Sequence, residues 1–263
     1  MPSYFNDKKG QKRKGFILRL KVYGFLVIFL ALVVGVAYLV FYSPLFQVKS
    51  ISVDFSGAES FPNLSGDLRV FFASQSAFNS FLGLNNILLW ENGEVSEDFF
   101  RNCPQVESIR IERNIWERKV NLVVQERKRF GVWCSGNCWW FDRNGIIFAG
   151  APNVEGGLIK KVNDFSGRHL EKGDKVLESP LMGNLVKIFD VLDEVGLVSC
   201  FELERLELQE ITAVPIRKDF PNIYFSLRID PSFGLSALQQ LKEKGLTDIS
   251  YIDLRVENRA YYK

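Results

Sequence analysis

Histidine is almost absent from this chain of 263 residues: His169 is the only one, and it lies in a polar stretch between two glycines. A His-Glu-x-x-His metalloprotease helix needs two histidines and is therefore excluded. The sequence also lacks a Gly-x-Ser-x-Gly nucleophile elbow and a Gly-x-x-x-x-Gly-Lys phosphate-binding loop. Carboxylate pairs such as Asp190 and Glu194 are expected on the polar face of a helix. We predict no catalytic residue, no metal and no cofactor, although a site made of carboxylates alone stays open.

An excess of positive charge is also missing from most of the chain. Residues 43–263 contain 26 basic and 30 acidic side chains, a net charge of −4, which argues against a general nucleic-acid binder. The first 21 residues are the exception, with seven basic side chains and one acidic side chain. Basic flanks of a membrane segment stay in the cytoplasm and attract anionic lipid head groups. We therefore predict that residues 1–21 form a basic cytoplasmic tail.

One long run has no charge at all. Residues 22–42 read VYGFLVIFLALVVGVAYLVFY, and as a helix they would reach roughly 30 Å, the thickness of a bilayer's hydrocarbon core. A buried core helix would carry a polar stripe, which is missing here. A cleaved signal peptide would end its apolar region in small residues, and Val40–Pro44 offers no such site. The run predicts a retained transmembrane helix with the following domains outside the cytoplasm.

Residues 43–127 show the pattern of a small α+β domain. Apolar residues alternate between Phe46 and Phe55, which predicts a strand, and recur at three and four from Ser65 to Leu82, which predicts a helix. A short helix is expected from Ser96 to Asn102, with Pro104 just beyond its end. Two strands follow, one around Val106–Ile111 and one around Val120–Val124. This order favours helices on one face of a sheet.

Residues 128–263 have a more β-rich pattern. The segments on either side of Ser135–Asn137 predict a hairpin, and Asp142–Gly145 predicts a tight turn into the next strand. A clear amphipathic helix begins at Ser179-Pro180 and should end at Gly196. The remaining elements that we expect are strands at Leu203–Leu208 and Ile223–Ile229, a helix from Leu235 to Gly245, and a final half-buried strand from Ile249 to Glu257. We predict an α+β chain: a transmembrane helix, a first α+β domain, and a β-rich domain with two helices packed on a mixed or antiparallel sheet.

Cysteine is scarce, with four in the chain, at positions 103, 134, 138 and 200. If residues 135–137 form the hairpin loop, Cys134 and Cys138 face each other across two strands, within reach of a disulfide. Such a bridge is allowed outside the cytoplasm, and two free thiols are the alternative. The spacing differs from Cys-x-x-Cys, which disfavours both a redox dithiol and a zinc knuckle.

Several motifs, taken in order over residues 22–263, resemble the FtsQ/DivIB family of bacterial cell-division proteins. After a single anchor helix come Phe46-x-Val48-x-x-Ile51-x-Val53, Pro104-x-Val106-x-x-Ile109-x-Ile111-x-Arg113, Val120-x-Leu122-x-Val124-x-Glu126-Arg127, Asp142-x-x-Gly145-x-x-Phe148 and Tyr251-Ile252-Asp253-Leu254-Arg255. The resemblance implies a POTRA domain at residues 43–127 and an FtsQ-type β domain at residues 128–263. It further implies a non-enzymatic, single-pass scaffold of the cytoplasmic (inner) membrane at the division site, which regulates septal peptidoglycan synthesis.

The partners that the resemblance implies are small bitopic coiled-coil division proteins of the FtsB/FtsL or DivIC/FtsL type, other divisome proteins and the lipid bilayer. Docking is expected at the last strand of the second domain, because an unpaired edge offers backbone groups to an incoming strand. The expected partner-binding residues are Tyr251, Asp253, Arg255, Val256, Glu257, Arg259, Ala260, Tyr261 and Tyr262. A second recruitment surface is expected at Ser108, Ile109 and Ile111.

Three alternatives stay open. Tyr251 and Arg255 could simply cover the outer face of the sheet, with residues 261–263 as a frayed end. The chain could belong to a secretion or assembly system that uses POTRA domains, although such proteins usually repeat the unit or append a β-barrel. It could also be a membrane-anchored hydrolase, which would require a concave site with perturbed acids.

Overall fold

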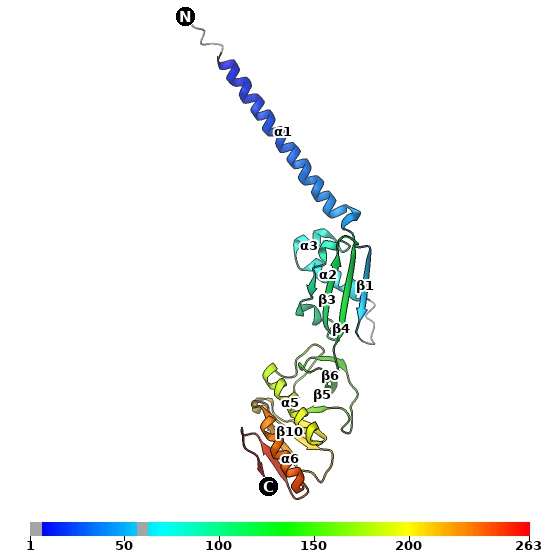
Figure 1. Ribbon diagram of the computed structural model, residues 1–263, viewed down its shortest axis with the longest axis vertical. Helices are drawn as coiled ribbons and strands as arrows, with labels where there is room; N and C mark the ends of the chain where they lie inside the picture. Colours follow the sequence, from blue (N-terminus) through cyan, green and yellow to red (C-terminus); the bar gives the residue numbers. More distant parts are fainter. Residues whose placement is uncertain (1–6, 57–62) are drawn as a thin grey trace. The chain divides into compact units, whose positions relative to one another are not determined.

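A computed structural model describes residues 7–56 and 63–263 and shows a mixed α+β chain with an apolar helix at its N-terminal end (Figure 1). This helix, α1, spans Asp7–Tyr42, so it continues through part of the predicted basic tail; residues 1–6 of that tail lie outside the described ranges. Its segment Leu20–Tyr42, 23 residues long, is the one helical stretch in the described chain that is long and apolar enough to cross a membrane. Because its apolar side chains are mostly exposed, the protein itself provides no core to bury them.

The rest of the chain forms two compact units. The first takes in the chain up to Val95 together with Ile109–Val123, and the second takes in Ser96–Ser108 together with Val124–Lys263. A four-stranded sheet has the order β1-β4-β3-β2. Its elements and their neighbours are η1 (Pro44–Phe46), β1 (Ser50–Phe55), α2 (Leu64–Ser74), α3 (Ala77–Leu82), η2 (Ile87–Leu89), β2 (Gly93–Glu94), α4 (Glu97–Phe100), β3 (Val106–Asn114) and β4 (Lys119–Glu126).

The single helix predicted for Ser65–Leu82 is wrong, because two helices occupy this stretch. The α2 helix ends at Ser74, and Ser76 then takes an extended conformation and accepts a hydrogen bond from the Asn79 N–H at 3.1 Å, which caps α3. Serine side chains can bond to nearby backbone groups and so interrupt a helix. The spacing of the apolar residues gives no sign of this interruption. The predicted strands of this region are present as β1, β3 and β4.

The second sheet has nine strands in the order β13-β12-β11-β10-β9-β8-β5-β6-β7. Pairing is antiparallel except for β5 with β8, β8 with β9, and β11 with β12, which are parallel. Its elements are β5 (Gly131–Ser135), β6 (Asn137–Phe141), β7 (Ile147–Gly150), β8 (Lys161–Asp164), α5 (Ser179–Val195), β9 (Ser199–Leu203), η3 (Leu206–Leu208), β10 (Glu210–Pro215), β11 (Asn222–Ser226), η4 (Pro231–Phe233), α6 (Gly234–Lys244), β12 (Tyr251–Leu254) and β13 (Tyr261–Tyr262). The predicted hairpin around Ser135–Asn137 is confirmed as β5–β6.

The amphipathic helix predicted from Ser179 is confirmed as α5, and it ends as expected at Gly196, whose φ of 72° is left-handed. Its apolar face is buried: Leu185, Ile188 and Leu192 are at most 2 % exposed and belong to the same core cluster as residues of the sheet. Each such side chain contributes roughly 2 kcal/mol through burial. The helix predicted from Leu235 is confirmed as α6.

The strand predicted at Leu203–Leu208 is wrong. The strand β9 ends at Leu203, the next apolar residues form the 3-10 turn η3, and Gln209 takes a left-handed φ of 53°. This turn sends the chain back as β10, a strand that the sequence pattern did not predict. The predicted strand at Ile223–Ile229 corresponds to the shorter β11, which ends at Ser226.

The last predicted strand needs a correction that bears on function. Its ordered part is β12, Tyr251–Leu254, which pairs with β11 on one side and with β13 on the other. The chain turns back after Leu254 through Asn258, whose φ is 58°, and Tyr261–Tyr262 then lies antiparallel to β12. Of the predicted docking residues, those of β12 therefore lie on an interior strand, whereas Tyr261 and Tyr262 form β13, the terminal strand of the sheet.

Candidate interaction surface at an open sheet edge

A turn after β12 brings the last residues of the chain back along β12, where they form β13, the terminal strand of the sheet. The Arg259 N–H donates to the Val256 carbonyl at 3.1 Å, which closes the turn, and Asn258 supplies the left-handed residue. Two backbone pairs, Ile252 with Tyr262 and Asp253 with Tyr261, then fix the register of β13. The C-terminal residues thus form an ordered strand, and the alternative of a frayed end at residues 261–263 does not describe this structure.

The register decides which backbone groups of β13 point outward. The Lys263 N–H donates to the Tyr251 carbonyl at 3.3 Å, and the Lys263 carbonyl accepts from the Ser250 N–H at 2.5 Å, so both backbone groups of Lys263 point toward the neighbouring chain, as in a hydrogen-bonded pair. In an antiparallel ladder such pairs alternate with pairs whose backbone groups point away from the partner strand. The neighbouring pair, Ile252 and Tyr262, is of the second kind. The N–H and C=O of Tyr262 therefore face outward, in the direction from which another strand would pair.

The side chains around this edge are aromatic and charged. Tyr261 and Tyr262 are 47 % and 57 % exposed, and the Arg259 guanidinium donates to the Tyr261 hydroxyl at 3.3 Å. Val256 and Glu257 are exposed in the turn, whereas Ala260 packs against the hydrophobic core. Exposed tyrosine and arginine are typical of binding hot spots, so this part of the predicted partner-binding set lies together on an accessible surface.

Asp253 and Arg255, both in the predicted partner-binding set, form ion pairs within the sheet. Arg255 donates to both carboxylate oxygens of Asp253, at 2.9 and 2.7 Å, and to Glu210 of β10 at 2.9 Å. The hydrogen bonds from Arg255 hold the pKa of Asp253 below its ordinary value, and the bonds to both acids raise the pKa of Arg255. The guanidinium also lies 5.3 Å from the centre of the Tyr224 ring. These groups cover the sheet face and tie β10, β11 and β12 together.

The second predicted surface, Ser108, Ile109 and Ile111, needs a correction. The side chains of Ile109 and Ile111 are buried, with 0 % and 2 % exposure, because they lie on the core-facing side of β3. The strand itself is interior, between β4 and β2. Of the three residues only Ser108 is partly accessible, so this set does not form an apolar contact surface.

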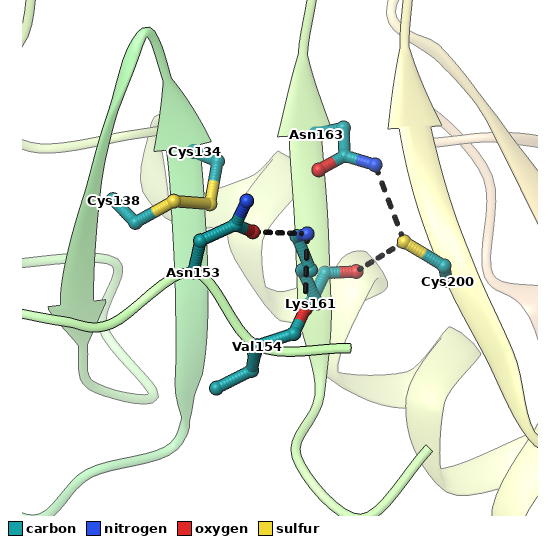
Figure 2. The surroundings of a disulfide bond; sticks show 7 residues. All are labelled: Cys134, Cys138, Asn153, Val154, Lys161, Asn163 and Cys200. Atoms are coloured by element: carbon teal, nitrogen blue, oxygen red, sulfur yellow. Dashed lines mark hydrogen bonds between the residues drawn. A yellow bond between two sulfur atoms is a disulfide. The ribbon is translucent and has the colours of Figure 1, made fainter. Parts of the chain in front are cut away.

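The cysteine pair that we considered from the hairpin pattern is joined by a disulfide. Cys134 and Cys138 are opposite residues of β5 and β6, with their Cα atoms 4.1 Å apart (Figure 2). Farther along the sheet, Cys200 accepts a hydrogen bond from the Asn163 amide at 3.3 Å, and burial raises the pKa of its thiol. The disulfide clips the hairpin next to the parallel pair of β5 and β8.

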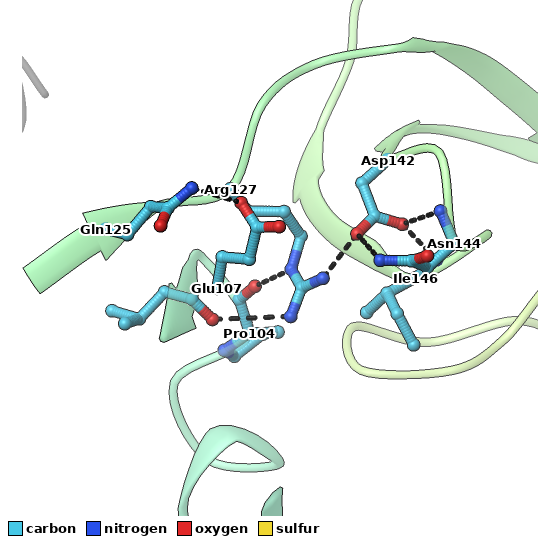
Figure 3. A network of polar contacts seen from close by, with 8 residues as sticks. Pro104, Glu107, Gln125, Arg127, Asp142, Asn144 and Ile146 are labelled. Carbon is cyan, nitrogen blue, oxygen red and sulfur yellow. Dashed lines mark hydrogen bonds and ion pairs between the residues drawn. The ribbon is translucent and has the colours of Figure 1, made fainter. Parts of the chain in front are cut away.

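A buried ion pair that the sequence analysis missed holds the turn before β7. The Arg127 guanidinium forms an ion pair with Asp142, and both side chains are less than a tenth exposed (Figure 3). Arg127 also donates to the Pro104 carbonyl at 2.8 Å, while Asp142 accepts from the N–H groups of Asn144 and Ile146 at 2.9 and 2.8 Å. Arg127 ends one of the motifs described above and Asp142 begins another. A sequence pattern does not show that residues of two separate motifs are in contact.

A cleft of about 390 Å³ lies close to this ion pair in the second unit. Its lining consists of Glu107, Gln125, Lys128, Arg129, Phe130, Asp142, Arg143, Asn144 and Lys160. Both acids are engaged: Asp142 by Arg127, and Glu107 by the Gln125 amide at 3.3 Å. A membrane-anchored hydrolase would need a cleft with poised acids, so this cleft does not support that alternative. Within residues 7–56 and 63–263, no group of three or more His, Cys, Asp or Glu side chains is placed to hold a metal ion.

Comparison with known proteins does not assign the chain to a family. No protein-family model matches the sequence, and no curated protein matches it significantly. The contacts described above thus define a class only: a mixed α+β chain with an N-terminal helix apolar enough to cross a membrane, two sheets, and an accessible strand edge at its C-terminus.

Proposed function

We propose that this chain is a non-enzymatic, single-pass membrane scaffold of the FtsQ/DivIB type. In this role α1 anchors it in the cytoplasmic membrane with the basic tail inside, and the two sheet-bearing parts lie outside the membrane at the division site. The scaffold recruits small bitopic coiled-coil division proteins and so regulates septal peptidoglycan synthesis. The length and composition of Leu20–Tyr42 support the anchor, and the basic residues before it support the orientation.

The order of elements in the first sheet supports a POTRA domain at residues 43–127. The residue pattern predicts a strand, two helical stretches and a closing pair of strands. The strand β1, the helical stretch of α2 and α3, the short helix α4, and the strands β3 and β4 follow one another in that order. The helix α4 lies within the short helix predicted from Ser96 to Asn102, and the two-residue strand β2 is an addition to the pattern.

The observation that carries the proposal is the outer side of β13. The Tyr262 N–H and C=O point away from β12, and β13 is the end of the nine-stranded order. A partner strand laid along β13 would satisfy these groups, as in other complexes formed by strand addition. Tyr261 and Tyr262 would supply aromatic contacts, and Glu257 and Arg259 would supply charge complementarity in the adjoining turn.

Truncation after Glu257 tests the proposal in the full-length, membrane-inserted protein. The shortened chain lacks β13 but keeps all of β12, so we expect it to fold, to stay in the membrane and to lose affinity for the coiled-coil partners. Membrane pull-down should measure partner binding, and fluorescence microscopy should measure localisation separately. Stronger binding by the shortened chain would place the docking edge on β12, and unchanged binding would place the interface elsewhere.

A further inference from the structure

The side chain of Trp116, a large apolar ring, is almost completely exposed to water. Trp116 is 98 % exposed at the turn between β3 and β4, and its neighbour Ile115 is 41 % exposed. The other tryptophan of this compact unit, Trp90, is fully buried in the core. A hairpin tip in water would carry a polar side chain without loss of pairing, because Trp116 is not part of either strand. Together with Ile115, the indole forms an exposed apolar tip, and contiguous apolar surface of this kind is typical of interaction sites.

Hydrogen bonds hold this turn beside the end of α1. The Arg118 guanidinium donates to the Pro44 carbonyl at 2.7 Å, and the Lys49 N–H donates to the Arg118 carbonyl at 2.8 Å. Pro44 is only two residues beyond Tyr42, the last residue of the apolar span. Two residues of chain reach about 7 Å, so the turn lies within a short distance of the level at which α1 ends.

A second segment is held at the same level on the other side of the connection. The Asn86 amide donates to the Val40 carbonyl of α1 at 2.9 Å, and the Val48 N–H donates to the Asn85 carbonyl at 2.8 Å. Exposed apolar side chains accompany both segments. We call them the apolar rim, and they are Leu45, Phe81, Leu84, Ile115 and Trp116.

We propose that the apolar rim inserts into the interface of the outer membrane leaflet next to α1. This inference rests on the proposed membrane insertion of α1 and commits to one partner, the lipid bilayer. Tryptophan is favoured at this depth because its ring is apolar while its N–H finds partners among the head groups. Three basic residues, Lys49, Arg118 and Lys119, lie in or beside the segments that carry the rim, and Lys119 forms an ion pair with Glu117 at 3.1 Å. Exposed basic residues at this level would favour anionic lipid head groups.

The insertion has a consequence for the first compact unit. A domain tied to the bilayer by one helix could swing about the residues that follow that helix. A rim that enters the lipid adds a second attachment at Trp116 and restricts this motion, so the domain keeps one face toward the membrane. The arrangement needs no further partner protein, and the hydrogen bonds from Arg118 and Asn86 keep the rim at the correct height.

Quenching by brominated lipids tests the inference in the full chain. The protein is reconstituted in phosphatidylcholine–phosphatidylglycerol vesicles whose acyl chains carry bromine near the head group, and tryptophan emission is compared with that in unbrominated vesicles. We expect the wild type to lose a share of its emission that Trp116→Phe does not lose. Trp140→Phe, which removes a partly buried tryptophan of the second unit, should keep that loss.

The outcomes separate this inference from the proposed function. Equal fractional quenching in the wild type and in Trp116→Phe, with the protein still resistant to alkaline extraction, would overturn the insertion of the rim while leaving the anchor intact. Release of the protein by alkaline extraction would overturn both. Stronger quenching by bromine near the head group than by bromine deep in the acyl chain would support insertion at the interface.

Discussion

The two edges of the nine-stranded sheet are treated very differently by the rest of the chain. At the β7 edge, the Ile147 N–H donates to the Asp174 carbonyl at 2.9 Å, and the Ile147 carbonyl accepts from the Gly173 N–H at 2.7 Å. At the β13 edge, the outward groups of Tyr262 meet no strand of the sheet. The molecule closes one edge with its own loop and ends the other with two exposed tyrosines.

This difference between the β7 edge and the β13 edge indicates where an incoming strand could pair. Proteins usually protect sheet edges by covering them or by keeping them short. Residues 173–175 cover β7, whereas β13 is merely short, so it resists unspecific pairing but remains accessible to a partner that also binds its side chains. The comparison makes β13 the edge at which the proposed strand addition would occur, and it makes β7 the internal control.

The largest effect on docking is expected from Tyr262→Pro. Proline removes the outward N–H and is tolerated on an edge strand, while the pairs that Tyr261 and Lys263 make with β12 stay possible. Loss of the first backbone bond to the partner, together with the tyrosine ring, should weaken docking by roughly tenfold or more. Affinity for the coiled-coil partners, measured on the full chain in nanodiscs, gives the answer.

Tyr262→Phe is the matched control for this change, because it keeps the backbone donor and the ring. It should bind the partner nearly as well as the wild type. If Tyr262→Pro and Tyr262→Phe bind equally well, the outward backbone groups have no role and the comparison of the two edges loses its functional meaning.

Arg127→Ala removes the ion pair that supports the turn before β7, the covered edge of the sheet. The substitution leaves the Asp142 carboxylate buried without its cation, which should cost about 3 kcal/mol of unfolding free energy in the second unit. Because Asp142 holds the Ile146 N–H, the β7 edge should also exchange its amide protons faster. Chemical denaturation followed by tryptophan fluorescence measures the first effect.

Lys128→Ala is the neighbouring control, because Lys128 is an exposed cation and should change stability by no more than about 0.5 kcal/mol. Docking of the partner should survive both substitutions in protein that remains folded. Equal stability of the Arg127 and Lys128 variants would contradict the structural role of the buried ion pair.

Removal of the disulfide should have a smaller effect on stability, and the β13 edge should not depend on it. Replacing Cys134 and Cys138 by serine opens a very short loop, so the loss of unfolding free energy should be roughly 2 kcal/mol. Partner affinity should stay the same, because β5 and β6 lie away from β13 in the strand order. Denaturation with and without reductant checks this, and a wild type that is insensitive to reductant would argue against the bridge.

The smallest effect is expected from pH near the open edge. Arg255 lowers the folded pKa of Asp253 below 3.8, so the stabilisation is complete above that ordinary value and is lost as pH falls through the lower folded pKa. Because the pair is partly exposed, it should contribute less than about 1 kcal/mol. Asp253→Asn should narrow the stability difference between pH 7 and about pH 3, and an unchanged difference would show that Asp253 is not a source of it.

The sequence predicts the elements that depend on local patterns. The helix from Ser179 to Gly196 combines an apolar stripe with a left-handed closing residue, and the hairpin at Cys134 and Cys138 has alternation on both sides of a turn. Both signals lie within a few residues, and both were predicted correctly. The long apolar run of α1 was equally clear from residues 22–42.

What the sequence does not predict depends on pairing between distant segments. The apolar residues of η3 alternate as in a strand, yet Gln209 turns the chain there and β10 follows. Likewise, the alternation of Tyr251–Leu254 is the same for an interior strand as for an edge strand. Only the return of Tyr261–Tyr262 across Asn258 makes β12 interior, and the ion pair of Arg127 with Asp142 is equally invisible along the chain.

The most direct measurement is amide hydrogen exchange at Tyr262, in the full chain embedded in nanodiscs, with and without the proposed coiled-coil partners. Strand addition at β13 predicts that partner binding slows exchange at Tyr262 and leaves Ile147, on the covered edge, unchanged. A partner that binds without slowing exchange at Tyr262 would contradict docking at this edge.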